Sequence, residues 1–138
     1  MLFPKKVKRI KMHKRNSLKR SSKTLELTKG NFGVKAITNG RITVQQLEAA
    51  RQTMVKKSKK SGKIWLRIFP DLAITSKPAE VRMGKGKGAF DFWCCPIKAG
   101  RIIFEFEGIQ KSLAYEVARV GSKKLSVHTK FITQNNKI

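Results

Sequence analysis

The chain has 138 residues, of which 32 are Lys or Arg and 8 are Asp or Glu, giving a formal net charge of +24. This length suits one domain with one modest core. Because the sequence has no long apolar run, we expect no membrane-spanning helix and no secretory signal. Because so basic a chain repels itself, we expect an anionic partner to neutralise it, with nucleic acid favoured over an anionic membrane surface.

The N-terminal segment is especially basic. Residues 1–23 hold ten Lys or Arg and no acid, and their apolar residues are too sparse to form a core. We therefore predict an extended arm that is disordered when free and ordered on an anionic surface. An organellar transit peptide, which is also basic and poor in acids, is the alternative interpretation.

Strand-like patterning begins after the arm, between residues 24 and 37. Phe32, Val34 and Ala36 recur at period two, which places them on one face of a strand. Asn39-Gly40 then signals a turn.

A helix is predicted next. Thr43 suits the N-cap, and Gln46, three residues later, completes a capping box. Ser61-Gly62 should end the helix. Apolar residues at helical spacing predict its buried stripe: Val44, Leu47, Ala50 and Met54.

Much of the remaining surface of this helix is basic, and no acid lies between Glu48 and Asp71. A solvated surface normally mixes charges of both signs, so we interpret this one as facing phosphates, with a plain solvated face as the alternative. The cations concerned are Arg51, Lys56, Lys57, Lys59 and Lys60.

The segment 63–70 has the clearest strand pattern of the chain. On one face Arg67 stands between Trp65 and Phe69, a set that could stack on bases. Packing of the two aromatic side chains under a neighbouring loop is the commoner arrangement. The opposite face is aliphatic: Ile64, Leu66 and Ile68.

A Gly/Lys-rich segment at 76–90, here called the finger, is predicted to protrude as a loop. Glycine and lysine alternate from Gly84 to Gly88, just after Arg82, so the segment cannot bury an apolar face and its N–H groups stay accessible. Positive charge beside bare N–H groups suits a phosphate chain. Because these residues cannot contribute to a core, we expect substitutions in the finger to leave the fold nearly intact.

Local pattern alone leaves an ordinary solvated loop open as the alternative. Two enzyme-like interpretations are weaker. A nucleotide-binding phosphate loop needs Ser or Thr after its lysine, whereas Gly88 follows Lys87. A dinucleotide-binding fingerprint opens a helix, whereas the finger leads into a strand pattern, Phe-Asp-Phe-Trp.

Two strands, near 90–97 and 102–107, follow the finger and are joined by a hairpin-like connection. In the second, Glu105 and Glu107 lie at strand spacing. Paired carboxylates can do acid–base chemistry, but no nucleophile or His accompanies them, so we predict a structural or solvated role in an ordinary half-buried strand.

A second helix is predicted from 111 or 112 to 124, with Leu113, Val117 and Val120 as its stripe. A last strand at 126–133 and a polar tail at 134–138 complete the chain. Three small residues should let the helix approach the sheet closely: Ala114, Ala118 and Gly121.

No catalytic or metal-ligand spacing stands out. Cys94 and Cys95 are adjacent in a strand, so their side chains point to opposite faces and should be small fillers rather than a disulfide, in a reducing compartment. His13 and His128 lie far apart, which argues against a zinc site. We predict no enzymatic activity, no cofactor and no metal.

Residues 62–71, taken with Arg82-Met83-Gly84-Lys85-Gly86-Lys87-Gly88, resemble the universal L-sixteen family of large-subunit ribosomal proteins. Departures occur at 15–24, at Cys94-Cys95-Pro96 and at Ser126-Val127-His128. Similar blocks follow in the same order along nearly the whole chain: Met12-His13-Lys14, Phe32-Gly33-Val34-Lys35-Ala36, Gln46-Leu47-Glu48-Ala49-Ala50-Arg51, Lys77-Pro78, Phe106-Glu107-Gly108-Ile109 and Lys130-Phe131.

The resemblance implies an α+β fold: an antiparallel sheet with two helices packed on it, a long protruding Gly/Lys loop and a basic extended N-terminal arm. It suggests an arm at 1–23, a single rRNA-binding domain at 24–133 with the loop at 76–90, and a tail at 134–138. It also implies a place in the large ribosomal subunit near the peptidyl-transferase region, where the protein helps to position the aminoacyl- and peptidyl-site tRNAs.

The basic segments and the resemblance together give two sets of candidate residues. Those expected to bind rRNA are Lys5, Lys6, Lys8, Arg9, Lys11, His13, Lys14, Arg15, Arg51, Lys56, Lys59, Lys60, Lys63 and Arg67. Those expected in the loop that faces tRNA or rRNA are Lys77, Arg82, Met83, Gly84, Lys85, Gly86, Lys87 and Gly88.

The expected partners are large-subunit rRNA, tRNA and neighbouring ribosomal proteins, with a monomer in the ribosome and no membrane contact. The Lys-, Ile- and Asn-rich composition, family-like sequence from Met1 and the departures suggest an organelle-encoded protein, mitochondrial rather than plastid. A divergent bacterium is the alternative source.

Two other classes of function compete. A nucleoid-type DNA-binding or RNA-chaperone protein would share the charge, but it needs no ordered strand beside a Gly/Lys finger. Co-sedimentation with large ribosomal subunits would separate the two. A phosphate-handling enzyme would need a nucleophile–base pair, a carboxylate cluster or metal ligands, which the sequence lacks.

Overall fold

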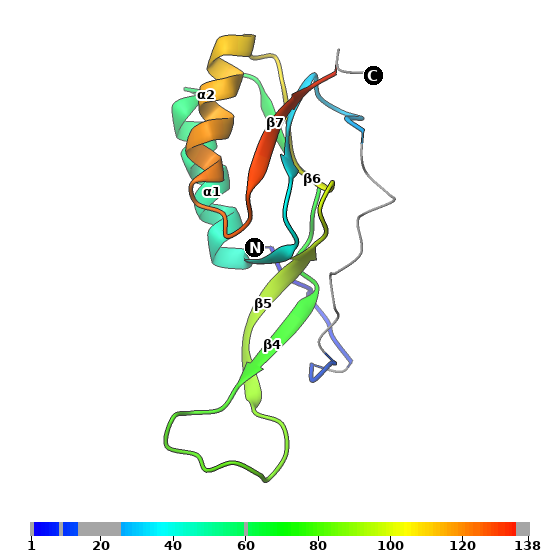
Figure 1. Ribbon diagram of the computed structural model, residues 1–138, viewed down its shortest axis with the longest axis vertical. Helices are drawn as coiled ribbons and strands as arrows, with labels where there is room; N and C mark the ends of the chain where they lie inside the picture. Colours follow the sequence, from blue (N-terminus) through cyan, green and yellow to red (C-terminus); the bar gives the residue numbers. More distant parts are fainter. Residues whose placement is uncertain (1, 9, 14–25, 60, 135–138) are drawn as a thin grey trace.

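The computed structural model describes residues 2–8, 10–13, 26–59 and 61–134. Over these residues the chain folds into two antiparallel sheets and two helices, which confirms the predicted α+β class (Figure 1). The elements are β1 (Phe32–Ala36), β2 (Gly40–Thr43), α1 (Val44–Lys57), β3 (Lys63–Leu66), β4 (Leu72–Ser76), β5 (Ala89–Ile97), β6 (Ile102–Glu107), α2 (Lys111–Ser122) and β7 (Thr129–Thr133).

The larger sheet has the strand order β3-β6-β1-β7, and both helices lie on one side of it (Figure 1). Side chains that face one another across neighbouring strands share a face of the sheet. Phe104 of β6 pairs with Val34 and Leu66, and Phe106 pairs with Phe32. These residues therefore line the helix side of the sheet and form the core together with residues of the helices, including Leu47, Ala50, Met54, Ala114 and Val117.

Helix α1 begins as predicted. The hydroxyl oxygen of Thr43 accepts a hydrogen bond from the Gln46 N–H at 3.2 Å, and the Gln46 side chain accepts one from the Thr43 N–H at 3.1 Å. The helix ends at Lys57, earlier than the predicted Ser61-Gly62. The Ser58 hydroxyl donates to the Val55 carbonyl at 3.0 Å, and Lys59 takes a left-handed φ of 50°, which stops the helix.

One of the three small residues of α2, Gly121, has a different neighbour from the one predicted. Ala114, Ala118 and Gly121 are buried, but a Cβ on Gly121 would collide with the Met54 side chain of α1. The absence of a side chain at that point therefore lets the two helices approach each other rather than the sheet. On the outer side of the same helix pair, Lys57 Nζ lies 2.8 Å from Glu116 and lowers the pKa of that carboxyl.

Two predicted strands are shorter in the structure. β3 stops at Leu66, although the Arg67 N–H still donates to the Ile103 carbonyl at 2.9 Å. β7 starts at Thr129 rather than 126, because side chains replace the ladder there. The Ser126 hydroxyl donates to the Arg41 carbonyl at 2.7 Å, and the His128 N–H donates to the Thr38 hydroxyl at 3.0 Å.

The smaller sheet, with strand order β2-β5-β4, carries the finger. β2 pairs only with Cys94–Ile97, the second half of β5, whereas β4 pairs with β5 from Ala89 to Cys94. The first half of β5 and the facing part of β4 are thus a two-stranded ribbon, which extends away from the helices toward the finger (Figure 1). Neither helix within the described residues is long and apolar enough to span a membrane.

Cys94 and Cys95 are both buried and both free, each with 1% of its surface exposed. Adjacent strand residues point to opposite faces, so both faces of β5 are covered at this point. Burial raises the pKa of both thiols, that of Cys95 to about 11. The prediction that the two cysteines are small fillers rather than a disulfide is confirmed, and both lie in the interior.

Thiol modification tests this burial. A buried thiol whose pKa is about 11 has roughly a thousandth of its population ionised at pH 8. We expect native protein to resist alkylation at both cysteines, whereas protein unfolded in guanidinium should be labelled twice, as mass spectrometry would show. Equal labelling rates in the native and unfolded states would contradict the buried arrangement.

Candidate nucleic-acid interface

The finger protrudes at the end of the β4–β5 ribbon farthest from the helices (Figure 1). β4 ends at Ser76 and β5 begins at Ala89, so the loop itself comprises residues 77–88, within two residues of the predicted limits. It holds four cations and one acid, Glu80, and every side chain from 77 to 87 is exposed. The exposed cations are Lys77, Arg82, Lys85 and Lys87.

Glycine occupies its positions in the finger for two different structural reasons. Gly84 and Gly86 have φ values of 99° and 82°, Lys85 between them has 55°, and a Cβ built on either glycine meets nothing. These two glycines permit a left-handed backbone. At Gly88, by contrast, a Cβ would collide with the Ser76 carbonyl across the ribbon. The expectation that finger substitutions leave the fold intact is therefore wrong at Gly88.

The N-terminal arm touches the base of the finger. Lys11 Nζ donates to the Lys87 carbonyl at 3.1 Å, and Lys87 Nζ donates to the Met12 carbonyl. Because carbonyl oxygens rather than acids accept these bonds, neither bond neutralises the positive charge of Lys11 or Lys87. The arm and the finger thus join into one basic surface, on which Lys5, Lys6, Lys8, Lys11 and His13 are exposed.

The start of the arm also contributes apolar contacts, which the sequence did not predict. Leu2 is half-buried and packs against the core. With Phe3 it lines a groove bounded by α1 and β3, where Val44 and Leu66 lie. This contact fixes one end of the arm to the domain.

The other predicted rRNA-binding residues are spread over α1 and its C-terminal side. Lys56, Lys59 and Lys63 are exposed. Arg51 instead binds Glu48 through two bonds of 3.0 and 2.6 Å, which lower the pKa of Glu48 and raise that of Arg51. Part of its charge is thereby compensated within the helix. Arg9, Lys14, Arg15 and Lys60 lie outside the described residues.

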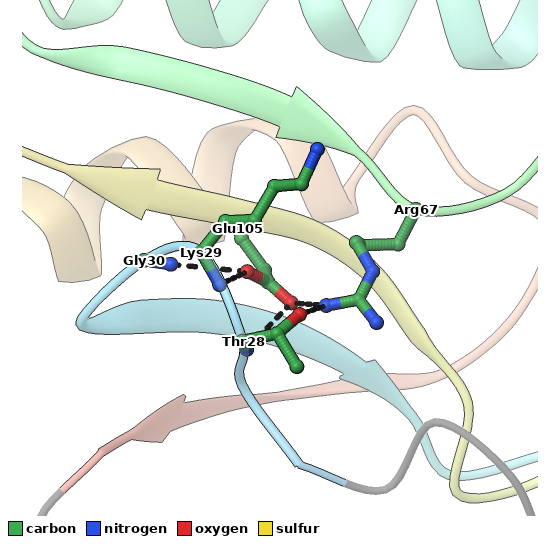
Figure 2. A network of polar contacts seen from close by, with 5 residues as sticks. All are labelled: Thr28, Lys29, Gly30, Arg67 and Glu105. Carbon is green, nitrogen blue, oxygen red and sulfur yellow. Dashed lines mark hydrogen bonds and ion pairs between the residues drawn. The ribbon is translucent and has the colours of Figure 1, made fainter.

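Arg67 has an internal role (Figure 2). Its guanidinium donates to the carboxylate of Glu105 and to the Thr28 hydroxyl, and its side chain is 17% exposed. The stacking set considered as one possibility, Arg67 between Trp65 and Phe69, is not assembled, since Arg67 turns toward Glu105. Trp65 is half-buried, and Phe69 has 48% of its surface exposed.

Glu105 is fully buried on the face of the sheet opposite to the helices, where it pairs with Gly33 and Trp65. Its carboxylate accepts the N–H groups of Lys29 at 2.7 Å and Gly30 at 3.0 Å, and that of Thr28 at 3.4 Å (Figure 2). Three successive N–H groups form an anion-binding concavity of the kind that phosphates occupy elsewhere, and here a carboxylate fills it.

Glycines make this anchor possible. A Cβ on Gly30 would collide with the backbone of Phe106, and one on Gly33 would collide with the side chain of Leu27. The segment 27–30 therefore lies directly on β1 and β6. The predicted structural role of Glu105 agrees with this network, although β6 is buried at all five positions from Ile102 to Phe106 rather than half-buried. Glu107 is exposed.

No group of three or more His, Cys, Asp or Glu side chains within the described ranges could hold a metal ion. The features that the structure does offer are exposed cations, accessible glycine backbone and a projecting ribbon. These can bind a polyanion but supply no nucleophile–base pair for catalysis.

Residues 4–132 match the family model described as Ribosomal protein L16p/L10e. The chain belongs to this family. Among its relatives, the "Large ribosomal subunit protein uL16" of Aeromonas hydrophila and that of Mesorhizobium japonicum are each 46% identical over 132 residues, which covers 96% of this chain and 96% of each relative. The resemblance inferred from the finger is thereby confirmed, and the L16p/L10e family is one of ribosomal proteins, not of enzymes.

The Glu105 network yields a stability prediction. Glu105→Ala would remove the acceptor of the buried Gly30 N–H and of the part-buried Thr28 and Lys29 N–H groups, and would leave Arg67 without its carboxylate partner. We therefore expect the free energy of unfolding to fall by about 3 kcal/mol. Glu107→Ala, two residues along the same strand and exposed, is the matched control and should change it by less than about 0.5 kcal/mol. Urea unfolding measures both. Similar losses for the two variants would show that the network does not stabilise the fold.

Proposed function

We propose that this protein is a structural constituent of the large ribosomal subunit. In this proposal it binds the large-subunit rRNA near the peptidyl-transferase region and helps to position the aminoacyl- and peptidyl-site tRNAs. The observation that carries the proposal is the finger: a basic, Gly-rich loop held away from the core on a two-stranded ribbon, with its cations exposed. The names of the relatives, each a large ribosomal subunit protein, support the location.

The division of work follows from what each segment contacts. The C-terminal part of α1 presents exposed cations on the body of the domain, and the arm presents them beside the base of the finger, which suits backbone contacts with folded rRNA. The finger has few contacts with the body, so it can reach a second RNA, and we assign it to the tRNA-facing surface. Neighbouring ribosomal proteins complete the set of partners.

We further propose that the ribosome concerned is mitochondrial. The composition, rich in Lys and Ile, supports this location, whereas the relatives at 46% identity are bacterial. Fractionation of the source cells, followed by detection of the protein in mitochondrial or in cytoplasmic ribosomes, decides between the two.

Co-sedimentation in a gradient tests the main assignment. A nucleoid-type or RNA-chaperone protein would spread over many nucleic acids, whereas a subunit constituent should travel with large subunits and with one species of rRNA. Recovery of the protein with DNA or with mixed RNA, and not with large subunits, would overturn the proposal.

The charge distribution predicts strong salt dependence of rRNA binding. Each phosphate contact releases counterions, so log K should fall with log salt by roughly 0.7 to 0.9 per contact. Lys56→Gln with Lys59→Gln should lower that slope by about 1.5, because both side chains are exposed on the basic end of α1. Filter binding over a salt series measures the slope. A slope near zero for the unaltered protein would mean that its charge does not bind the RNA.

The finger should affect tRNA more than assembly. Arg82→Ala removes a planar, forked donor that is fully outside the core, so we expect normal incorporation into large subunits but weaker tRNA binding or slower late maturation. Arg119→Ala, an exposed arginine on α2, is the control. Protein content of purified subunits and tRNA binding by those subunits are the two measurements.

A loop replacement extends this test, provided that Gly88 is kept because it closes against Ser76. Ala or Ser at Gly84 and Gly86 should act as Arg82→Ala does. Normal tRNA binding by these subunits would reduce the finger to a surface loop. Variants that never enter subunits would instead make it an assembly anchor.

A further inference from the structure

A pair of aromatic side chains on the stem of the finger lies outside both predicted sets of RNA-binding residues. Phe90 and Trp93 of β5 have ring centroids 5.2 Å apart, with the ring planes inclined by 50°. Phe90 has 40% of its surface exposed, and Trp93 is half-buried. The pair is therefore an accessible surface of two rings rather than part of the core.

A β-bulge creates this pair. Trp93 pairs with Ala73 and Phe90 pairs with Thr75, and the register shifts between Ile74 and Thr75 so that β5 has one extra residue, Asp91. Without the bulge, residues 90 and 93 would point to opposite faces of the ribbon. With it they share a face, because Ala73 and Thr75 lie two residues apart on β4. Period-two counting in the sequence could not reveal this pair.

The pair lies where β5 has a strand partner on one edge only, and the 40% exposure of Phe90 shows that its ring is accessible. β2 pairs with β5 only from Cys94 onward, so Phe90 and Trp93 lie where β5 has β4 as its single strand partner. The ribbon runs away from α1 and α2 at this point (Figure 1). Exposed rings at the root of a functional loop are unlike scattered surface hydrophobics, since they adjoin a surface of defined charge.

Charge around the pair indicates what covers it. The two strand segments 72–76 and 89–95 contain no Lys or Arg and one acid, the exposed Asp91, so the ring face itself offers nothing to a phosphate. The cations start immediately beyond, at Lys77, which lies two residues past Thr75, the partner of Phe90. That is roughly 7 Å along a strand. Two accessible rings beside exposed cations fit one chemical unit, a nucleotide with its base on a ring and its phosphate on the lysines.

We propose that Phe90 and Trp93 form a stacking platform for an unpaired base of a bound RNA. The inference rests on the proposed RNA-binding function and adds a base contact to what the cations supply. Because every base has a π-face, the platform selects unpaired over paired nucleotides rather than one sequence. It also fixes the stem of the finger on the RNA, so that the loop beyond is held at a defined place.

Tryptophan fluorescence tests the platform directly in the full chain. The protein has two tryptophans, and Trp65→Phe leaves Trp93 as the single reporter. The probes are an oligoadenylate of about twelve nucleotides and an abasic strand of the same length and charge, both at about 0.15 M salt. We expect both probes to bind, but only oligoadenylate to quench Trp93.

Substitutions at Phe90 separate stacking from simple apolar contact. Phe90→Ala and Phe90→Leu should each weaken oligoadenylate binding by about tenfold and leave abasic binding unchanged. Tyr115→Ala, which removes another exposed ring on α2, should change neither. Thermal unfolding checks that the partly exposed Phe90 variants stay folded.

The outcomes distinguish the platform from the function on which it rests. Equal quenching of Trp93 by both probes would overturn stacking. Undiminished oligoadenylate binding by Phe90→Leu would also overturn stacking and would favour an apolar protein partner for the two rings. Such results would leave the salt-dependent binding and the co-sedimentation intact. Failure of the unaltered protein to bind either probe or to enter large subunits would instead overturn the proposed function.

Discussion

One buried carboxylate fixes the segment that precedes β1 to the sheet. Glu105 lies on the face of the sheet that the helices leave uncovered, and its carboxylate accepts hydrogen bonds from three backbone N–H groups and from the Arg67 guanidinium. A buried carboxylate without such partners would be strongly unfavourable. The chain before β1 is therefore held against the sheet, and its direction is set before the arm begins.

Other acids of the domain are likewise paired with cations. The chain has 8 acids against 32 cations, and three of these acids are paired with cations on the body of the domain: Glu105 with Arg67, Glu48 with Arg51, and Glu116 with Lys57. None of these pairs involves the arm or the finger, so the exposed cations of the finger take part in none of the three.

Local signals in the sequence predicted local structure well. The capping box at Thr43 and Gln46 fixes the start of α1 through bonds three residues apart, so a short window contains the whole cause. The Gly/Lys segment of the finger is also a local signal, because Gly and Lys at alternate positions exclude a core role whatever the neighbouring segments are. The family followed from the same residues.

What the sequence could not predict depends on partners distant along the chain. Arg67 looked like an RNA ligand because Glu105, 38 residues away, becomes its neighbour only through the β3–β6 register. Gly88 looked interchangeable with Gly84 until the ribbon placed the Ser76 carbonyl against it. Phe90 joins Trp93 through one extra residue in β5, which no periodicity in the sequence records.

The bulge in the ribbon also limits how its length can change during evolution. Deleting the extra residue Asp91 would restore regular alternation and keep Phe90 and Trp93 on one face, because they would then lie two residues apart. Deleting Phe92 as well would make the two rings adjacent and turn them to opposite faces. Removing two residues from each strand would keep the faces but shorten the reach by roughly 7 Å. Apart from the loss of Asp91, insertions and deletions in this stem therefore change either which side chains share a face or how far the finger extends.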